Sequence, residues 1–510
     1  MSEKAVIDNK EEFNILQDIA METLSQETIE RIGEDIEISN KYLDIIMEYI
    51  KKLRRGRYKK EMIEGFMRMI RRNKEIVVRV MIKHRGKGKC LCEDEEFQKY
   101  YQVEWKEKRC GVIEIIRREK AMEEVVDSEE GVEEMIEWFD KIYNIKEIEG
   151  QTLYFDKRLI EEEGLIKKEK EELFKERISI IDWKCEIDPF FTRKKILCLR
   201  GIKKYKTSNG PIEIQVTLES KEGIEIKTII YKKGDDLRKD EGAEISFNIF
   251  NVIWKRFLNK NYGITINNKE IIGQAKTYGV IALREGGIIE KIGCTPMKVL
   301  CKIHRELTCC IDGRIYEEYS QNGCLECSKQ LNIEKKNIEN KIKLIESLVG
   351  GFIGGYIIGL RDRHLENMKI DLCESTFFHI DFGYLLNERP KFDANLFAIP
   401  SVLRNQLQEI VINQNQITMN CWDIFLLLSS KSFIILRRNN EMILNLLLLV
   451  FSFIDGFSID LITNTIKNSF HILDSEPLAT NKLLDDILSV SFQKIIKDNQ
   501  HEVLSWIRNN

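Results

Sequence analysis

The hydrophobic positions of the first 165 residues recur every three or four residues, which is the spacing of one face of an α-helix. Three stripes carry this pattern: Tyr42, Ile45, Ile46, Tyr49, Ile50 and Leu53; Met62, Phe66, Met69 and Ile70; and Val132, Met135, Ile136, Phe139 and Ile142. No proline occurs before Pro189, so none interrupts these helices. We therefore expect an all-α domain over residues 1–165, followed by a linker over 166–188.

After Pro189 the pattern changes to alternation of apolar and polar residues. Residues 212–216 and 224–229 alternate as half-buried strands do. Later, residues 347–359 form an apolar helical segment with two Gly-Gly pairs, where small residues allow close packing against a neighbour. We expect an α+β fold, with a strand-rich lobe over 189–284 and a mostly helical lobe over 285–510.

Composition restricts the class of protein. The chain has 510 residues, of which 43% are apolar, and a net charge of -4, so it is globular and has no bias towards nucleic acid. Thirteen cysteines without an apolar N-terminal signal segment favour a reducing compartment and free thiols. The most apolar run, 442–454, is too short to cross a bilayer. We expect a cytoplasmic protein that meets membranes only peripherally.

Two acids, an imidazole and an amide occur in one short stretch. The segment Gly-Leu-Arg-Asp-Arg-His-Leu-Glu-Asn, followed by Phe-His-Ile-Asp-Phe-Gly, supplies Asp362, His364, Asn367 and Asp381. Asp362 precedes Asn367 by five residues, as the catalytic Asp precedes the metal-binding Asn in protein kinases, where Asp-Phe-Gly carries a carboxylate to Mg²⁺. The set predicts phosphoryl transfer. The structural alternative makes Asp362 a turn cap and His379 a buried strand histidine.

A second motif lies in the strand-rich region. Residues 231–240 read Tyr-Lys-Lys-Gly-Asp-Asp-Leu-Arg-Lys-Asp. This segment resembles the F-K-x-G-D-D-L-R-Q-D motif of the phosphatidylinositol 3-/4-kinase superfamily, as does the order Asp-Arg-His before His-Ile-Asp-Phe-Gly. The resemblance implies a bilobal, protein-kinase-like catalytic domain over 189–510 that uses ATP with Mg²⁺ or Mn²⁺. It also implies that Lys232 neutralises phosphate oxygens and that Asp240 orients this lysine. An exposed charge run is the alternative for the decapeptide.

The same resemblance assigns the chemistry of the later motif. His364 takes the proton from the 3-hydroxyl of the inositol ring, and Asp362 either orients His364 or shares the role of base. Asn367 and Asp381 hold the metal ion. Arg361 stands where the family pattern has a glycine, directly before the catalytic Asp.

Further contacts with the nucleotide are expected from three places. Thr207 and Ser208 lie in a turn between two strands, where hydroxyls meet phosphate or simply close a hairpin. The apolar segment 278–284 occupies the place of the family's hinge, which connects the two lobes. We expect it to bond adenine through its backbone. The residues assigned to the nucleotide in this segment are Tyr278, Ala282, Leu283 and Arg284. The third place is His379, two residues before Asp381.

The loop after Asp-Phe-Gly bears on the substrate. Residues 384–400 contain no glycine, and their only bases are Arg389 and Lys391, offset by Glu388 and Asp393. Each lipid phosphate adds up to about two negative charges that need cationic partners, so we expect plain phosphatidylinositol, bound through Arg389 and Lys391. The loop resembles that of class III phosphatidylinositol 3-kinases, which implies a product for vesicle trafficking or autophagy. A phosphatidylinositol 4-kinase, a related protein Ser/Thr kinase and an inactive kinase-fold scaffold are the alternatives.

The C-terminal segment 483–507 is amphipathic and contains Trp506 near its end. It resembles the membrane-contacting helix of the family, although a core-packing helix fits the pattern as well. We expect it to hold the protein peripherally on endosomal or other internal membranes. A regulatory protein-kinase-like subunit is a possible partner, although no strand-rich segment is present in front for the C2 domain that class III enzymes carry.

A cysteine-rich segment separates the two motifs. It contains Cys294, Cys301, His304, Cys309, Cys310, Cys324 and Cys327. Cys324-x-x-Cys327 has the spacing of zinc ligands, but the remaining spacings are irregular, so free thiols are the default expectation.

Overall fold

The structure is a computed structural model. It describes residues 7–489 except 87–89, 107–108, 120–121, 123–127, 156–177, 181–194, 206–209, 221–222, 259–261, 267, 294, 297–337, 365, 372–373, 391–398, 400–402, 405–406, 409–410 and 415–416. The chain forms two compact units. The first comprises Met1–Asp8, Met21–Glu241 and Tyr278–Lys291, and the second Asn9–Ala20, Gly242–Thr277 and Ile292–Asn510.

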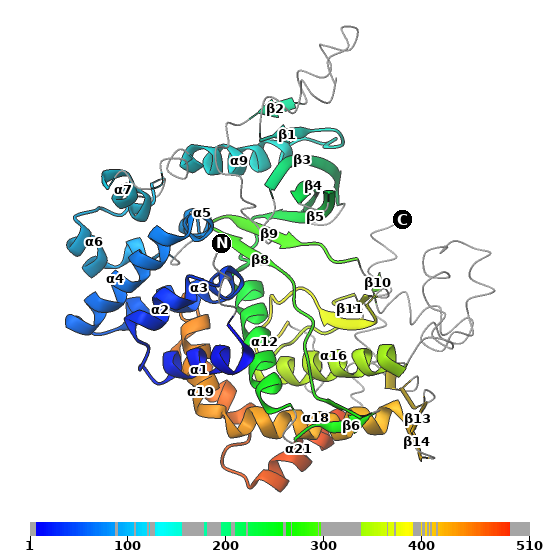
Figure 1. The fold of residues 1–510 in the computed structure, drawn as a ribbon. Helices are drawn as coiled ribbons and strands as arrows, with labels where there is room; N and C mark the ends of the chain where they lie inside the picture. Colours follow the sequence, from blue (N-terminus) through cyan, green and yellow to red (C-terminus); the bar gives the residue numbers. More distant parts are fainter. Residues whose placement is uncertain are drawn as a thin grey trace. The chain divides into compact units, whose positions relative to one another are not determined.

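The first unit begins with helices. They are α2 (Gln26–Ile32), α3 (Ile36–Lys52), α4 (Arg57–Arg72), α5 (Lys74–His84), the 3₁₀ turn η1 (Leu91–Glu93), α6 (Glu95–Tyr101), α7 (Gly111–Arg118) and α9 (Ser128–Tyr143) (Figure 1). Side chains that accept hydrogen bonds from first-turn N–H groups start several of them, including Ser25, Asp35, Asn73 and Asp94. The predicted stripes supply the buried side of α3, α4 and α9. Between residues 7 and 143, the described part of the chain contains helices and no strand.

A seven-stranded sheet completes this unit. Its strands are β1 (Thr152–Tyr154), β2 (Ile178–Ile180), β3 (Lys195–Lys204), β4 (Ile212–Ser220), β5 (Gly223–Lys233), β8 (Val280–Leu283) and β9 (Gly286–Glu290), in the order β2-β1-β3-β4-β5-β9-β8. The sheet is antiparallel except for the β1–β2 pair. It therefore uses strands on both sides of the predicted 189–284 lobe, because β1 and β2 precede residue 189 and β9 follows residue 284.

Strand β5 departs from the expected burial. Ile229 and Tyr231 are 2% and 3% exposed, whereas Ile224 and Ile226 are 71% and 60% exposed. A strand alternates faces with a period of two residues, so the odd spacing from Ile226 to Ile229 puts the two pairs on opposite faces. The alternation in the sequence is real, but it does not bury the first half of the strand.

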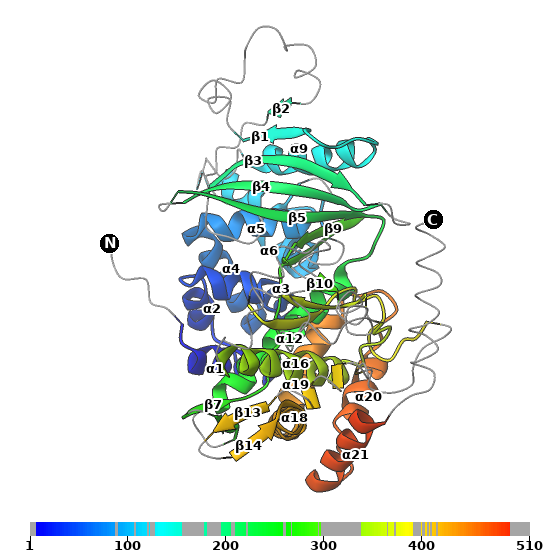
Figure 2. The ribbon, with the colours of Figure 1, turned by 90° about the vertical axis from the view of Figure 1, so that its right-hand side faces the viewer.

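The second unit is mainly helical. Its elements are α1 (Asn9–Ala20), most of α12 (Arg238–Phe257), β6 (Ile264–Ile266), β7 (Lys269–Ile271), β10 (Thr295–Pro296), α16 (Ile338–Ile357), β11 (Met368–Asp371), β12 (Thr376–His379), β13 (Val411–Gln414), β14 (Ile417–Asn420), α18 (Cys421–Arg438), α19 (Asn440–Phe451), α20 (Ile459–Ser469) and α21 (Glu476–Leu488). Helices α16 and α18 pack side by side (Figure 2). The α+β class predicted from the sequence is confirmed.

The glycines of α16 act in packing, as predicted. A Cβ atom on Gly350 would lie 2.1 Å from the backbone nitrogen of Ala275, and one on Gly354 would lie 2.6 Å from the ring of Phe247. Real Cβ atoms do not approach so closely, so glycine lets α16 meet its neighbours. None of the helices in the described part of the chain is long and apolar enough to cross a membrane.

A buried lysine joins distant segments of the first unit. Lys83, near the end of α5, is bonded to Asp44 of α3 at 2.5 Å and to Glu241 in the first turn of α12. The three side chains are only 8%, 7% and 4% exposed. Because buried charges are costly without partners, the ammonium group compensates both carboxylates.

We predict that Lys83→Met destabilises the first unit by about 3–5 kcal/mol, because two buried carboxylates lose their cation. The free energy of unfolding in urea measures this. Arg55→Ala is the control, because the Arg55–Glu95 pair is 75% and 83% exposed, and its loss should cost no more than about 1 kcal/mol. An equal, small effect of both changes would contradict the assignment.

Candidate functional site

The candidate catalytic segment follows α16 in the second unit. Gly359 has φ +61°, and a Cβ atom there would lie 2.7 Å from the backbone nitrogen of Asn387. Main-chain hydrogen bonds join the two segments that meet at this turn: Arg361 N–H to Tyr384 O at 2.9 Å and Asn387 N–H to Gly359 O at 2.9 Å. The stretches before and after Asp-Phe-Gly therefore lie side by side.

The hairpin of β11 and β12 brings the two predicted metal ligands together. Met368 pairs with His379, and one step further the N–H of Ile380 donates to the carbonyl of Asn367 at 3.0 Å. Asn367 precedes β11 and Asp381 follows β12, so both lie at the same end of the hairpin. This explains how residues separated by a strand pair in the sequence reach one place.

Arg363 is the centre of this arrangement. Its guanidinium group donates to the carbonyls of Arg361 at 2.8 Å, Ile380 at 2.8 Å and Asn367 at 3.4 Å, and also to the carbonyl of Asp381. The residue is 6% exposed. One buried cation thus fixes the backbone on both sides of the site by charge-assisted hydrogen bonds.

Both acids of the site have left-handed backbone conformations. Asp362 has φ +61° and Asp381 has φ +60°, a conformation that costs a non-glycine residue roughly 1–2 kcal/mol. Such strain persists only where surrounding contacts hold it. Phe382, which is fully buried against Phe247 with ring centres 5.9 Å apart, anchors the backbone after Asp381. The carboxylate of Asp381 remains exposed.

The donor atoms in this place suit a hard cation. The amide nitrogen of Asn367 donates to the carbonyl of Asp362 at 3.1 Å, which turns the amide oxygen away from that contact. This oxygen and the Asp381 carboxylate are the ligand types that Mg²⁺ prefers. The chemistry of the donor set therefore fits the metal expected from the sequence.

The Nδ1 atom of His364 has a hydrogen-bond partner within the loop. It accepts a hydrogen bond from the N–H of Glu366 at 3.2 Å. In the neutral ring the proton is then on Nε2, and this atom lies 3.9 Å from Oδ2 of Asp362. His364 therefore presents an N–H group, and not a lone pair, towards Asp362.

Lys232 lies on β5 in the first unit, opposite Gly287 of β9. We expected Asp240 to orient it, but the carboxylate near its Nζ is that of Asp235, at 3.8 Å. Asp240 is 5% exposed and lies in the first turn of α12. The role of Asp240 in orienting Lys232 therefore stays a prediction.

The segment expected to bond adenine lies in a hairpin. Ala282 and Leu283 belong to β8 and pair with Gly287 and Gly286 of β9. Strand β8 is the edge of the sheet, and the chain leaves the first unit only after Lys291. The place of a hinge therefore comes after β9, about ten residues later than we expected from the sequence.

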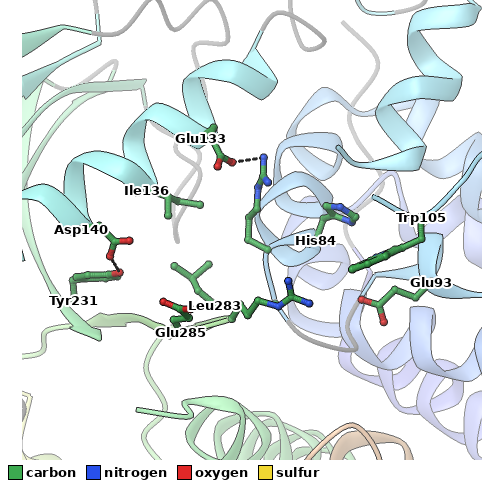
Figure 3. Close-up of a pocket in the computed structure, with 12 residues that line it drawn as sticks. His84, Glu93, Trp105, Glu133, Ile136, Asp140, Tyr231, Leu283 and Glu285 are labelled. Carbon is green, nitrogen blue, oxygen red and sulfur yellow. Dashed lines mark hydrogen bonds and ion pairs between the residues drawn. The ribbon is translucent and has the colours of Figure 1, made fainter. Parts of the chain in front are cut away.

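The side chains of Leu283 and Arg284 line a small cavity of the first unit (Figure 3). Its volume is about 180 Å³, below the roughly 300–1,000 Å³ of typical ligand pockets. An Arg85–Glu133 pair at 2.5 Å and a hydrogen bond from Tyr231 to Asp140 at 2.7 Å occupy its walls. Because the cavity is small and two polar pairs already form part of its walls, we assign no ligand to it.

Of the other expected site residues, some are buried, one is exposed and several lie outside the described part of the chain. His379 is 4% exposed and packs edge-on against Phe377 and Phe352, with ring centres 4.9 and 5.4 Å away, which favours the buried strand histidine. Tyr278 is buried and Arg389 exposed. Outside the described residues lie Thr207, Ser208, Lys391, Trp506 and all of the segment 297–337 with its Cys-x-x-Cys.

The sequence interpretation missed two residues of the site. Arg363 stands between Asp362 and His364 in the motif, and an arginine flanked by catalytic side chains was the available signal. Asn387 accepts from Nε of Arg361 at 3.0 Å, so the arginine that replaces a glycine of the family pattern has a partner. No sequence pattern marked Asn387.

Comparison with known proteins agrees with the geometry. Residues 226–452 match the family described as "Phosphatidylinositol 3- and 4-kinase". The phosphatidylinositol 3-kinase pik3 of Schizosaccharomyces pombe is 26% identical over 291 residues, which are 55% of this chain and 32% of that protein. The phosphatidylinositol 3-kinase VPS34 of Saccharomyces cerevisiae is 26% identical over 313 residues, which are 60% of this chain and 31% of the relative.

A third relative is the phosphatidylinositol 3-kinase catalytic subunit type 3 of Caenorhabditis elegans, 28% identical over 173 residues, or 32% of this chain and 16% of that protein. This chain thus spans about a third or less of the length of these three relatives. The matched family region contains both motifs recognised in the sequence. The resemblance inferred from those motifs is confirmed.

We predict that Arg363→Lys lowers kcat by at least about 10²-fold, because a single ammonium group cannot bond carbonyls on both sides of the site. Arg438→Lys is the control, since this arginine pairs with Glu476 at the surface, away from the site, and the change keeps its charge. Steady-state kinetics with circular dichroism for the fold distinguish the two variants. A fully active Arg363→Lys protein would show that the guanidinium contacts are not needed.

Proposed function

We propose that this chain, whose residues 226–452 belong to the phosphatidylinositol 3- and 4-kinase family, phosphorylates the 3-hydroxyl of phosphatidylinositol with ATP. The observation that carries the proposal is the convergence of Asp362, Asn367 and Asp381 around buried Arg363. The printed names of the relatives, which are phosphatidylinositol 3-kinases, support the choice of lipid and hydroxyl.

The proposed cofactor is Mg²⁺ or Mn²⁺ with ATP. Asn367 and Asp381 are the residues that would hold the metal, which supplies positive charge to the phosphate oxygens when bound. Lys232 is assigned to the phosphates by the motif in which it lies. These groups offer fixed charges for the developing negative charge, which is the main source of rate in phosphoryl transfer.

The hydrogen bond that Nδ1 of His364 accepts supports Asp362 as the base in this proposal. The neutral ring of His364 carries the proton on Nε2, so it cannot accept another one there. The ionised carboxylate of Asp362 can accept a proton, and the Asp362 side chain is 21% exposed. In this proposal Asp362 takes the hydroxyl proton, the hydroxyl oxygen attacks the γ-phosphorus, and ADP leaves. His364, whose Nε2 lies 3.9 Å from the carboxylate, is proposed to position it.

The substrate assignment rests on charge. Arg389 is exposed beside Glu388, and the only other base of this loop, Lys391, lies outside the described residues. One or two bases suit a headgroup with a single phosphodiester better than a bisphosphate. Phosphatidylinositol is therefore the proposed lipid, and Arg389 and Lys391 its proposed contacts.

Location and partners are proposed from the sequence. The amphipathic C-terminal segment, outside the described residues, is the proposed contact with endosomal or other internal membranes. A role in vesicle trafficking or autophagy, and a regulatory protein-kinase-like subunit, belong to the same proposal.

A lipid kinase assay tests the proposed function. Vesicles containing phosphatidylinositol, its 4-phosphate or its 4,5-bisphosphate are incubated with the chain, ATP and Mg²⁺, and the product isomers are separated by chromatography. We expect phosphatidylinositol 3-phosphate as the main product, and no product from Asp381→Asn. A 4-phosphate product would indicate a 4-kinase, and transfer to protein alone a protein kinase. Absence of any transfer by wild-type protein would indicate a scaffold.

A separate pair of variants tests the base. Asp362→Asn should lower kcat by about 10²–10⁴-fold, the usual value of general-base help. His364→Gln keeps an N–H donor and should lower kcat by less than about tenfold, with the acid limb of the pH–rate profile in place. If His364→Gln loses as much rate as Asp362→Asn and the acid limb disappears, the histidine is the base.

A further inference from the structure

Three cysteines and a histidine meet in the interior of the first unit, far in the sequence from the cysteine-rich segment considered above. They are His84, Cys90, Cys92 and Cys110, and one ligand atom of each lies within 4.8 Å of those of the others. Their exposed fractions are 4%, 0%, 1% and 2%. The three cysteines are free thiols.

The local fold brings the four residues together. His84 is the last residue of α5, Cys90 is the N-cap of η1, Cys92 lies within η1, and Cys110 is the N-cap of α7. In sequence the spacing is His-x₅-Cys-x-Cys-x₁₇-Cys. The ends of three elements thus converge, which is where structural metal ions commonly tie short segments together.

The histidine is oriented as a metal ligand. Its Nε2 lies 2.9 Å from the carbonyl of Lys106, to which Nε2–H donates, so the lone pair is on Nδ1. Nδ1 is buried and has no hydrogen-bond partner among the described residues. Buried polar atoms rarely lack partners, and an imidazole fixed by a carbonyl on its other nitrogen is the usual arrangement of a zinc-bound histidine.

The sulfur distances are compatible with one tetrahedral ion. With Zn–S bonds of about 2.3 Å, tetrahedral ligands have sulfur atoms about 3.8 Å apart. Cys92 Sγ and Cys110 Sγ are 3.7 Å apart, and Cys90 Sγ and Cys92 Sγ are 2.9 Å apart. The first distance fits as it stands, and the second requires a small rotation of one thiol.

Packing alone does not account for the cluster. Buried cysteines often behave as small apolar residues, and Cys198 and Cys421 do so elsewhere in the chain. Apolar packing gives no reason for an imidazole nitrogen without a partner beside three thiols. Three sulfur ligands and one imidazole select a soft or borderline cation, and Cys₃His is a common set of structural zinc ligands.

We propose that His84 Nδ1, Cys90, Cys92 and Cys110 bind one structural Zn²⁺ ion. With four protein ligands the ion has no open position, so its role is to stabilise the fold. It holds the last turn of α5, where Lys83 bonds Glu241 of α12. The site therefore supports the helical part of the first unit, and it does not depend on the proposed kinase activity.

Elemental analysis of the full chain, purified without a metal-affinity tag, tests the proposal. We expect about one zinc per chain, lost in Cys92→Ser and Cys110→Ser. The matched control Cys198→Ser replaces another buried thiol of the first unit and should keep the metal. The double variant Cys324→Ser/Cys327→Ser should also keep it. Loss of zinc in this double variant with retention in Cys92→Ser would overturn the proposal.

Two measurements on the wild-type chain keep the test valid if the variants do not fold. Zinc-edge X-ray absorption should give about three sulfur ligands at about 2.3 Å and one nitrogen at about 2.0–2.1 Å. Alkylation followed by mass spectrometry should show Cys90, Cys92 and Cys110 protected until a chelator is added. A chain that stays free of metal after incubation with Zn²⁺, or that contains a Cys90–Cys92 disulfide, contradicts the proposal.

Discussion

The hydrogen bonds of one buried guanidinium group determine the geometry of the candidate site. Arg363 bonds main-chain carbonyls of the catalytic loop and of the Ile-Asp-Phe segment, which the β11–β12 hairpin connects in sequence. Since both acids have left-handed backbone conformations, the site needs contacts that hold this strain. Arg363 supplies them through five donors in a rigid plane. Asp381 can then remain exposed while its backbone is held in place.

Buried polar side chains also connect distant segments of the first unit. Lys83 compensates two buried carboxylates from different helices, and the His84–Cys110 cluster lies directly after it in the chain. In each case a buried polar group acquires partners from segments distant in sequence. Helix α5, which precedes the sheet, is thus connected to the start of α12 by a polar contact.

Much of this organisation could be predicted from the sequence. The helical stripes were correct because α3, α4 and α9 are amphipathic and long. The two kinase motifs were recognised because they are contiguous, and the family comparison confirms them. The limits of the sheet were not predicted, because β1 and β2 are only three residues long. The place of the hinge depends on strand pairing, which a local pattern does not reveal. The cluster of His84 and three cysteines was overlooked because Cys-x-Cys is not a common ligand spacing.

The central claim is that Asn367 and Asp381, brought together around Arg363, form the metal site of a kinase. A crystal structure of the chain with Mn²⁺ and a non-hydrolysable ATP analogue tests it most directly through the anomalous signal of the metal. The account predicts a manganese peak bound to the amide oxygen of Asn367 and the carboxylate of Asp381, with Arg363 still bonded to the carbonyls of both segments. A peak that contacts neither side chain, or an Arg363 that faces solvent, would contradict it.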